Sequence, residues 1–147
     1  MKEVNRIALT GFIQELHKRG RSIEALAEAC RWGFIDEVKR LIDEVIDVNG
    51  RNSQQLTPIM YVGENLKILQ ILLDHHADVN ATDEKGRTAL IWLMAGLGKE
   101  TEVKKVVELL LKAGADVSAR MDDGSTAYDC GKGKYSDQLL DLLKPVA

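Results

Sequence analysis

Apolar residues recur at helical spacing in several short segments of the chain, and polar turns separate these segments. An apolar residue at every third or fourth position places one stripe of a helix against a core. Two segments show such a stripe: Ile35, Val38, Leu41/Ile42 and Val45 in the first, and Val103, Val106/Val107 and Leu110 in the second. A third segment, residues 66–73, is apolar on nearly every side, which indicates a helix buried between neighbours. The pattern therefore predicts an all-α arrangement of short helices in stacked layers.

Residues 3–19 form one further predicted helix ahead of these segments. Its apolar side carries Val4, Ile7/Ala8, Phe12 and Leu16. Lys18 and Arg19 suit the negative end of the helix dipole, and Gly20 suits the left-handed position that follows many helices. An end layer of a stacked array needs a cover for its apolar face. We interpret this helix as that N-terminal cap; a degenerate repeat, or a segment that docks elsewhere, is the alternative.

Two short motifs recur along the chain and divide it into units. Asp-Val-Asn or Asp-Val-Ser follows three apolar clusters, at residues 47–49, 78–80 and 116–118. A Thr-led motif starts at Thr57, Thr88 and Thr126, with spacings of 31 and 38 residues. Thr57 can accept a backbone N–H at a helix start, and Pro58 suits the first helical position because proline lacks an N–H. These motifs predict repeated units of a turn and two helices.

A period of about 33 residues with such Thr-led starts resembles the ankyrin repeat, over roughly residues 22–144. The resemblance implies an all-α ankyrin-repeat solenoid of stacked helix-turn-helix units joined by β-turn or hairpin loops. We expect a single domain, residues 1–147. Its expected parts are an N-terminal capping helix (1–21), repeat 1 (22–56), a shortened repeat 2 (57–87), repeat 3 with an insertion (88–125) and a C-terminal capping repeat (126–147).

Three features depart from the regular repeat. Where the family has a helix-ending glycine, as at Gly114, this chain has Val45 in the first unit and His76 in the second. A β-branched Val is poorly suited to positive φ, so we expect the helix near Val45 to end differently. The second unit is two residues short, which predicts a truncated first helix. The third unit has five extra residues near 95–100, whose glycines predict a loop at the end opposite the turns. That loop is either a binding feature or a tolerated insertion.

The composition limits the class of protein. The 147 residues include 20 Lys plus Arg and 23 Asp plus Glu, and this charge of −3 argues against binding nucleic acid through its phosphates. No apolar run approaches the ~18–20 residues that span a bilayer, and we see no secretory signal. Cys30 and Cys130 are too few for a disulfide framework, and we expect both to be buried and reduced. We therefore expect a cytoplasmic protein in a reducing compartment, while secretion as an effector stays open.

No group of residues predicts catalysis or a metal site. Residues 96–100 contain Gly-x-Gly-Lys, but they lack the first Gly of a phosphate-binding loop and the Ser or Thr directly after its Lys. His75 and His76 are adjacent, so their side chains point apart and cannot easily share one ion. Asp122 and Asp123 could pair as acid and base, but we place them in an exposed turn. We expect no enzyme activity, no cofactor and no metal.

The resemblance places partner contacts at the turn tips and on the exposed side of each first helix, along the concave face of the array. Carried over by position, the candidates are Arg31 and Trp32 in the first unit, Ser53, Gln54, Leu56, Met60 and Glu64 in the second, Glu84, Lys85, Arg87, Ile91 and Trp92 in the third, and Asp122, Asp123 and Ser125 in the last. Trp and Arg are frequent in binding hot spots, which favours Arg31, Trp32, Arg87 and Trp92. The alternative for each Trp is packing in the core.

We therefore predict a non-enzymatic monomer that binds another protein, and neither nucleic acid nor a membrane. One alternative is an inhibitor of a kinase, since the four-unit size and the shortened second unit resemble the ankyrin-type inhibitors of cyclin-dependent kinases. The insertion and the N-terminal helix depart from that family. A second alternative is a microbial effector acting on host proteins, which no feature of the sequence decides.

Overall fold

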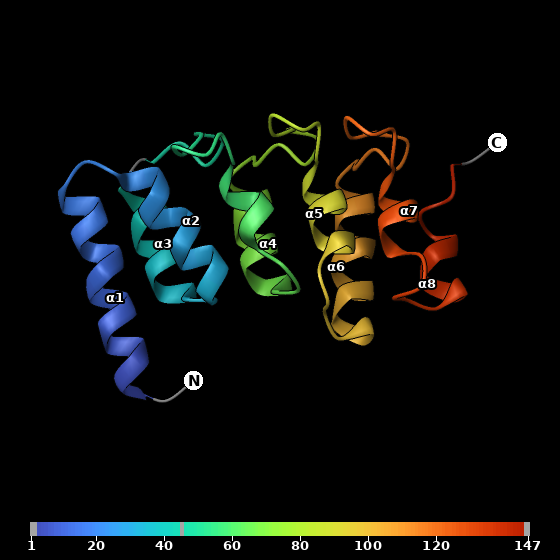
Figure 1. Cartoon of the computed structure of the whole chain (residues 1–147). Helices are drawn as coiled ribbons and strands as arrows, with labels where there is room; N and C mark the ends of the chain where they lie inside the picture. The colour runs from blue at the N-terminus through green and yellow to red at the C-terminus, as the bar shows by residue number, and fades with distance from the viewer. Residues whose placement is uncertain (1–2, 45, 146–147) are drawn as a thin grey trace.

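The computed structural model describes residues 3–44 and 46–145, and every regular element in these residues is helical. The elements are α1 (Glu3–Lys18), α2 (Ser22–Trp32), α3 (Ile35–Asp43), the 3₁₀ helix η1 (Pro58–Tyr61), α4 (Leu66–Asp74), α5 (Ala89–Ala95), α6 (Glu100–Lys112), α7 (Ala127–Gly131) and α8 (Asp137–Asp141). The helices follow one another along one direction, and the long loops gather at one end, at the top of Figure 1. This arrangement confirms the predicted all-α solenoid; the predicted unit boundaries stay a prediction.

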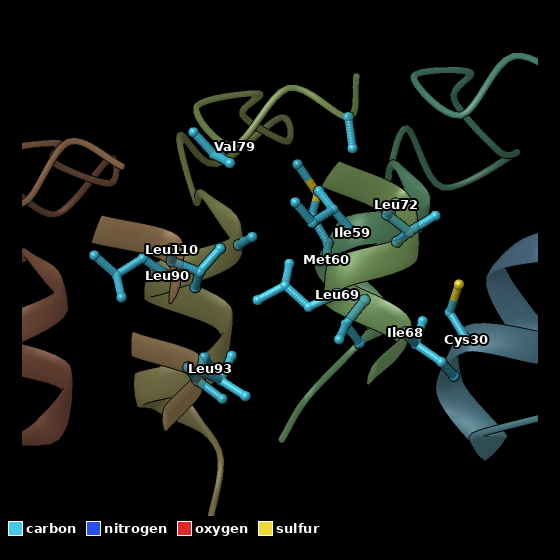
Figure 2. Close-up of a cluster of buried hydrophobic side chains, with 14 of the residues drawn as sticks. Cys30, Ile59, Met60, Ile68, Leu69, Leu72, Val79, Leu90, Leu93 and Leu110 are labelled. Atoms are coloured by element: carbon cyan, nitrogen blue, oxygen red, sulfur yellow. The ribbon is translucent and has the colours of Figure 1, made fainter. Parts of the chain in front are cut away.

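The helices form two rows, and each unit contributes one helix to each row. In the first row α2 contacts η1, η1 contacts α5, and α5 contacts α7; in the second row α3 contacts α4, and α4 contacts α6. Buried aliphatic side chains fill the space between the rows and between successive units. Figure 2 shows Met60 and Leu69 of the second unit across from Leu90, Leu93 and Leu110 of the third. Each layer therefore depends on its neighbour for burial of its apolar surface.

The threonines that open the units differ in what their hydroxyls do. The side chain of Thr88 accepts the backbone N–H of Ile91 (3.3 Å), and Thr126 caps α7 in the same way. The predicted cap at Thr57 is wrong, because its hydroxyl has no hydrogen-bond partner among the described residues. The tight 3₁₀ winding of η1 is the reason: the N–H of Met60 donates to the backbone carbonyl of Thr57 instead (3.1 Å).

The helix ends follow the sequence where a residue tolerates positive φ. Gly114 has a φ of +95° after α6, as predicted, and His76 takes the same left-handed conformation after α4 with a φ of +63°. A residue with a Cβ, other than Asn or Asp, is costly there by roughly 1–2 kcal/mol. Helix α3 ends at Asp43 with Glu44 as its C-cap; Val45, for which a different ending was predicted, lies outside the described residues.

The two irregular units have different outcomes. The predicted truncation of the first helix in the second unit is confirmed, since η1 is one turn of four residues. The prediction that the next helix, α4, is buried on nearly every side is wrong in part. Ile68 and Leu72 are fully buried, but Leu66 is 36% exposed. Leu66 is the first residue of α4, and a helical side chain leans toward the N-terminus, beyond the helix end at this position.

The extra residues of the third unit mostly lengthen a helix. Helix α6 has 13 residues, whereas α3 and α4 have nine each, and only residues 96–99 remain as a loop between α5 and α6. The predicted loop therefore exists and lies at the end opposite the turn tips, but it is shorter than expected (Figure 1). Polar residues of the first turn, Glu100 and Glu102, suit the positive end of the helix dipole and allow this extension.

The N-terminal helix is confirmed, but its predicted apolar side is mostly wrong. Leu16 is buried, as predicted, together with Ile13, while Leu9 is half-buried one turn earlier, and α1 packs against α2 through these residues. Ile7 and Phe12 are 72% and 51% exposed, and Ala8 is also exposed; the side chain of Val4 lies outside the described residues. The residues at i, i+4 and i+7 from Leu9 thus form the packing stripe.

Candidate functional site

Six of the predicted partner-binding residues line one depression between the turn tips of the second and third units. The depression has a volume of about 260 Å³. Its lining consists of Gln54, Leu56, Glu84, Lys85, Arg87 and Trp92, together with Asp83. The first two come from the loop before η1, and the others from the tip that precedes α5 and from α5 itself. Repeat stacking therefore brings together residues that the sequence separates by about one unit.

Asp83 organises the turn on which this depression is built. Its Oδ1 accepts the backbone N–H groups of Lys85 and Arg87, both at 2.9 Å, and its own N–H donates to the carbonyl of Arg87 (3.1 Å). Gly86 completes the turn with a φ of +75°, and a Cβ at Gly86 would meet the carbonyl oxygen of Arg120 in the next tip at 3.0 Å. The sequence Asp-x-x-Gly thus specifies both the turn and its contact with the following unit.

The second carboxylate oxygen of Asp83 holds the two largest side chains of the site. Nε of Arg87 donates to it at 2.7 Å, and the indole Nε1 of Trp92 donates to it at 3.2 Å. The guanidinium of Arg87 lies over the indole ring, 3.9 Å from its centroid, in a cation–π contact. Among the described residues, the guanidinium of Arg87 donates hydrogen bonds only through its Nε, and no bond from either Nη is found.

Burial and hydrogen bonding act in opposite directions on Asp83. Its side chain is only 3% exposed, and burial by itself raises its pKa. The backbone N–H groups of Arg87 and Lys85 and the guanidinium of Arg87 favour the carboxylate more strongly, so the pKa lies below its ordinary value. Asp83 is therefore ionised at neutral pH and forms an ion pair with Arg87 within the chain itself.

The tip of the last unit continues this surface. The N–H of Asp122 donates to the carbonyl of Lys85 (2.9 Å), which joins the last two tips. Asp122 and Asp123 are exposed, as predicted, and Oδ1 of Asp123 accepts the N–H of Ser125 at 2.8 Å. Hydrogen bonds from Ser125 lower the pKa of Asp123, so it stays ionised as a turn-forming group. The predicted candidates Asp122, Asp123 and Ser125 thus lie at the end of the same row of tips.

Two predicted contact residues belong to the core. Ile91 is 1% exposed and Met60 is 6% exposed, so neither offers surface to a partner in this structure. Both lie on the side of their helix that packs into the apolar interior, where Met60 faces the third unit (Figure 2). We correct the prediction for these two residues and drop them from the candidate surface.

Arg31 and Trp32 lie away from the turn tips. They end α2, and this end of the helix is opposite the loops in Figure 1. Trp32 is 40% exposed, and its Nε1 donates to Glu28 at 2.9 Å, so packing in the core is excluded for it. Arg31 pairs with the same Glu28 at 3.8 Å. This Arg–Trp pair therefore lies apart from Arg87 and Trp92, although the sequence predicted both pairs as contacts on one surface.

Ser53 and Glu64 take part in two neighbouring hollows. Ser53 and Gln54 line a depression of about 200 Å³ toward the first unit, together with Phe12 and Arg21. Glu64 lies at the mouth of an apolar pocket between the second and third units. This pocket was not predicted from the sequence. Two features of the sequence lie beside it, namely the shortened second unit and the glycines at 96 and 98.

The two cysteines differ in burial. Cys30 is buried as predicted, and burial raises the pKa of its thiol far above the ordinary value. Cys130 is only half-buried, which corrects the expectation of full burial, and desolvation also raises its pKa. In residues 3–44 and 46–145 we find no cluster of three or more His, Cys, Asp or Glu residues suited to a metal ion. None of the helices described has the length and apolar character needed to cross a bilayer.

Comparison with known proteins agrees with the repeat pattern. Residues 5–83 match the model for ankyrin repeats in three copies, and residues 85–122 match the model for a single ankyrin repeat. The first match begins within α1 and ends at Asp83, in the tip that precedes α5. The two matches together cover the helices from α1 to α6 and most of the candidate surface, and they end before α7.

The chain is also similar to several curated proteins. It is 40% identical over 100 residues to the human (Homo sapiens) ankyrin repeat and SOCS box protein 6, which covers 65% of this chain and 24% of that protein. It is 32% identical over 110 residues to ankyrin repeat, SAM and basic leucine zipper domain-containing protein 1 of Dasypus novemcinctus, covering 74% and 22%. It is 37% identical over 105 residues to ankyrin repeat and SAM domain-containing protein 6 of Rattus norvegicus, covering 69% and 11%.

The relatives are thus much longer than the part that this chain matches, which spans about a quarter of their length or less. Their similarity lies in the ankyrin repeats, as the family models show independently. The chain belongs to the ankyrin repeat family, whose repeats generally serve as protein–protein interaction modules.

Proposed function

We propose that the chain binds another protein through the turn tips of its second, third and last units, with Arg87 and Trp92 at the centre. The single observation that carries this proposal is the depression lined by six of the predicted contact residues, in which Arg87 and Trp92 form a cation–π pair and the other four lie around them. The family match and the relatives support a protein as the partner. Because this family is typically non-catalytic, we propose binding without an enzyme activity.

The local geometry suits a binding hot spot. Trp92 is half-buried and Arg87 keeps 25% of its side chain exposed, so both present area to a partner while their inner atoms stay hydrogen-bonded. Glu84, Lys85 and Gln54 are exposed around them and supply a polar rim. Ordering flexible side chains costs about 0.5–1.5 kcal/mol each on binding, and Asp83 has already ordered these two. Hot spots favour such central Trp and Arg residues.

The test compares two Arg–Trp pairs in the same protein. Partners are first selected with the wild-type chain from a displayed protein library, and their dissociation constants are then measured with purified variants. Arg87→Ala combined with Trp92→Ala should raise the constant by roughly 30-fold or more, the effect of losing a hot spot of about 2 kcal/mol. The matched control, Arg31→Ala combined with Trp32→Ala, should change it less than about threefold.

Far-UV circular dichroism of both variants checks that the fold is intact. Equal loss of affinity in the two variants, or loss only in the control, contradicts the proposed surface. A selected partner whose affinity neither variant changes contradicts it as well, since the binding face then lies elsewhere on the array.

A further inference from the structure

The shortened second unit leaves an apolar pocket between the second and third units. Its volume is about 230 Å³. The walls are largely aliphatic and come from η1, α4, α5 and α6; they include Ile59, Leu69, Leu93, Val103 and Leu110. An apolar cavity of ~150 Å³ accommodates a benzene ring. The pocket therefore has room for one large apolar side chain, and one turn of 3₁₀ helix in place of a longer helix is what leaves this space open.

Hydrogen bonds fix the loop between α5 and α6 that borders the mouth of the pocket. Oε2 of Glu64 accepts the N–H of Lys99 at 2.8 Å. The hydroxyl of Tyr135, from the last unit, donates to the carbonyl of Gly96 (3.2 Å) and accepts the N–H of Gly98 (3.1 Å). The loop between α5 and α6 is thus fixed from both neighbouring units, and the pocket does not need to be ordered when a ligand enters.

Charge and exposure at the mouth indicate what enters. Glu64 is exposed, and no Lys, Arg or His of the described residues forms an ion pair with it, so its carboxylate presents an unbalanced negative charge. Leu97, on the same rim, is 89% exposed and extends the apolar surface outward. An occupant that is apolar inside the pocket and positively charged just outside it satisfies both features.

The pocket is continuous with the turn-tip surface through one side chain. Trp92 lines this pocket as well as the depression that holds Arg87. A partner that covers Trp92 from the turn tips therefore reaches the mouth of the pocket without leaving the surface.

We propose that the pocket receives one large apolar side chain of the partner, a Phe, Leu or Met, and that a Lys or Arg beside it in the partner pairs with Glu64. The inference rests on the proposed protein-binding function and specifies the partner's chemistry at this part of the surface. The apolar residue supplies a buried anchor, and the neighbouring cation selects among the many segments that carry such an anchor.

The experiment titrates blocked dipeptides into the ¹⁵N-labelled chain and follows the backbone amides by NMR. Acetyl-Phe-Lys-amide should shift the amides of Gly63, Gly96 and Gly98 with saturation. Acetyl-Ala-Lys-amide, which lacks the anchor, and acetyl-Phe-Glu-amide, which has the wrong charge, should bind at least threefold more weakly. Shifts centred on another apolar surface, such as Ile7 and Phe12 of α1, overturn the proposal, as does equal binding of all three peptides.

Two substitutions separate the anchor from the charge. Glu64→Gln keeps the acceptor for Lys99 but removes the charge, and should weaken acetyl-Phe-Lys-amide about two- to fivefold while leaving acetyl-Phe-Glu-amide unchanged or tighter. Glu84→Gln removes the same charge at the turn tip and should have no such effect. Ala89→Leu fills the pocket and should abolish the shifts of both Phe peptides. If Ala89→Leu fails to fold, the comparison of Glu64→Gln with Glu84→Gln still decides the matter.

Failure of the pocket proposal and failure of the proposed turn-tip surface give different results in these experiments. If the dipeptides do not bind the pocket but Arg87→Ala with Trp92→Ala still weakens a selected partner, only the pocket proposal is overturned. If the dipeptides bind as expected but that double variant leaves every partner unaffected, the turn-tip surface is overturned and the pocket stands as a separate site.

Discussion

The guanidinium of Arg87 lies 3.9 Å from the centroid of the Trp92 ring, and both side chains donate a hydrogen bond to the same oxygen of Asp83. One buried carboxylate therefore fixes the geometry of the two residues at the centre of the proposed surface. It also closes the turn through its other oxygen. The stability of the third unit and the orientation of Arg87 and Trp92 thus depend on the same carboxylate. The turn at Asp122 and Asp123 differs, because its carboxylates are exposed.

Replacing Asp83 by Asn should destabilise the protein. Asn keeps one oxygen for the turn, but its amide group would face the N–H donors of Arg87 and Trp92, which would lose their acceptor. Loss of such buried hydrogen bonds costs about 1–3 kcal/mol, to be measured as the free energy of unfolding in urea. Asp122→Asn, in an exposed turn position, should change that free energy by less than ~0.5 kcal/mol. Equal effects of the two substitutions would show that Asp83 does not anchor the site.

The same carboxylate should make stability depend on acidity. Hydrogen bonds and Arg87 lower the folded-state pKa of Asp83 below the value near 3.9 of an unfolded aspartate, despite its burial. Its contribution is then fully present above about pH 4 and is lost as the pH falls through the folded-state pKa. Wild type should therefore lose more unfolding free energy than Asp83→Asn between pH 5 and the acid range. The exposed carboxylates are common to both proteins and cancel in this difference; parallel curves would contradict the prediction.

The sequence specifies the repeats much better than it specifies the site. The Thr-led starts, Gly114 and the missing residues of the second unit are local signals, and they correctly predicted two helices per unit and a truncated first helix in the second unit, although not its 3₁₀ winding. The sequence also placed Trp92 on the first helix of the third unit. Its hydrogen bond to Asp83 was not predicted, because it joins a helix residue to a turn residue nine positions earlier. The pocket at Glu64 depends on three units at once, so no motif within one unit contains it.

The prediction of the packing face of the N-terminal helix was wrong for a geometric reason. Ile13 is fully buried and Ile7 is 72% exposed, although both are apolar residues of α1. A helix with apolar residues at positions 7, 9, 12, 13 and 16 offers two overlapping stripes, and only the crossing with α2 selects between them.

These two isoleucines provide a matched pair for the capping role of α1. Ile13→Ala removes a fully buried side chain and should lower the free energy of unfolding by about 2–4 kcal/mol. Ile7→Ala should change it by less than ~0.5 kcal/mol, because that side chain has little to lose. Thermal and urea unfolding of the two variants measure the difference. Similar, small effects of both would show that α1 does not cover the first unit.

The threonines give a second matched pair. The hydroxyl of Thr57 is buried without a partner among the described residues, whereas that of Thr88 caps α5. Thr57→Val should therefore leave stability within ~0.5 kcal/mol of wild type or raise it, because an unsatisfied polar group is replaced by a methyl of similar size. Thr88→Val should cost about 1 kcal/mol through loss of the cap. The reverse order in urea unfolding would mean that Thr57 does cap η1.

Tyr135 offers a test of the loop that borders the apolar pocket. Its side chain is buried, and its hydroxyl bonds both Gly96 and Gly98, so it holds the loop from the last unit. Tyr135→Phe removes both bonds while keeping the ring in place, and should lower the free energy of unfolding by about 1–2 kcal/mol. Amide hydrogen exchange at Gly98 should accelerate more than the global loss of stability explains, because the loop opens locally. Tyr128→Phe is the control, since the hydroxyl of Tyr128 makes no hydrogen bond found among the described residues; unchanged exchange at Gly98 in Tyr135→Phe would mean that Glu64 and Lys99 alone hold the mouth of the pocket.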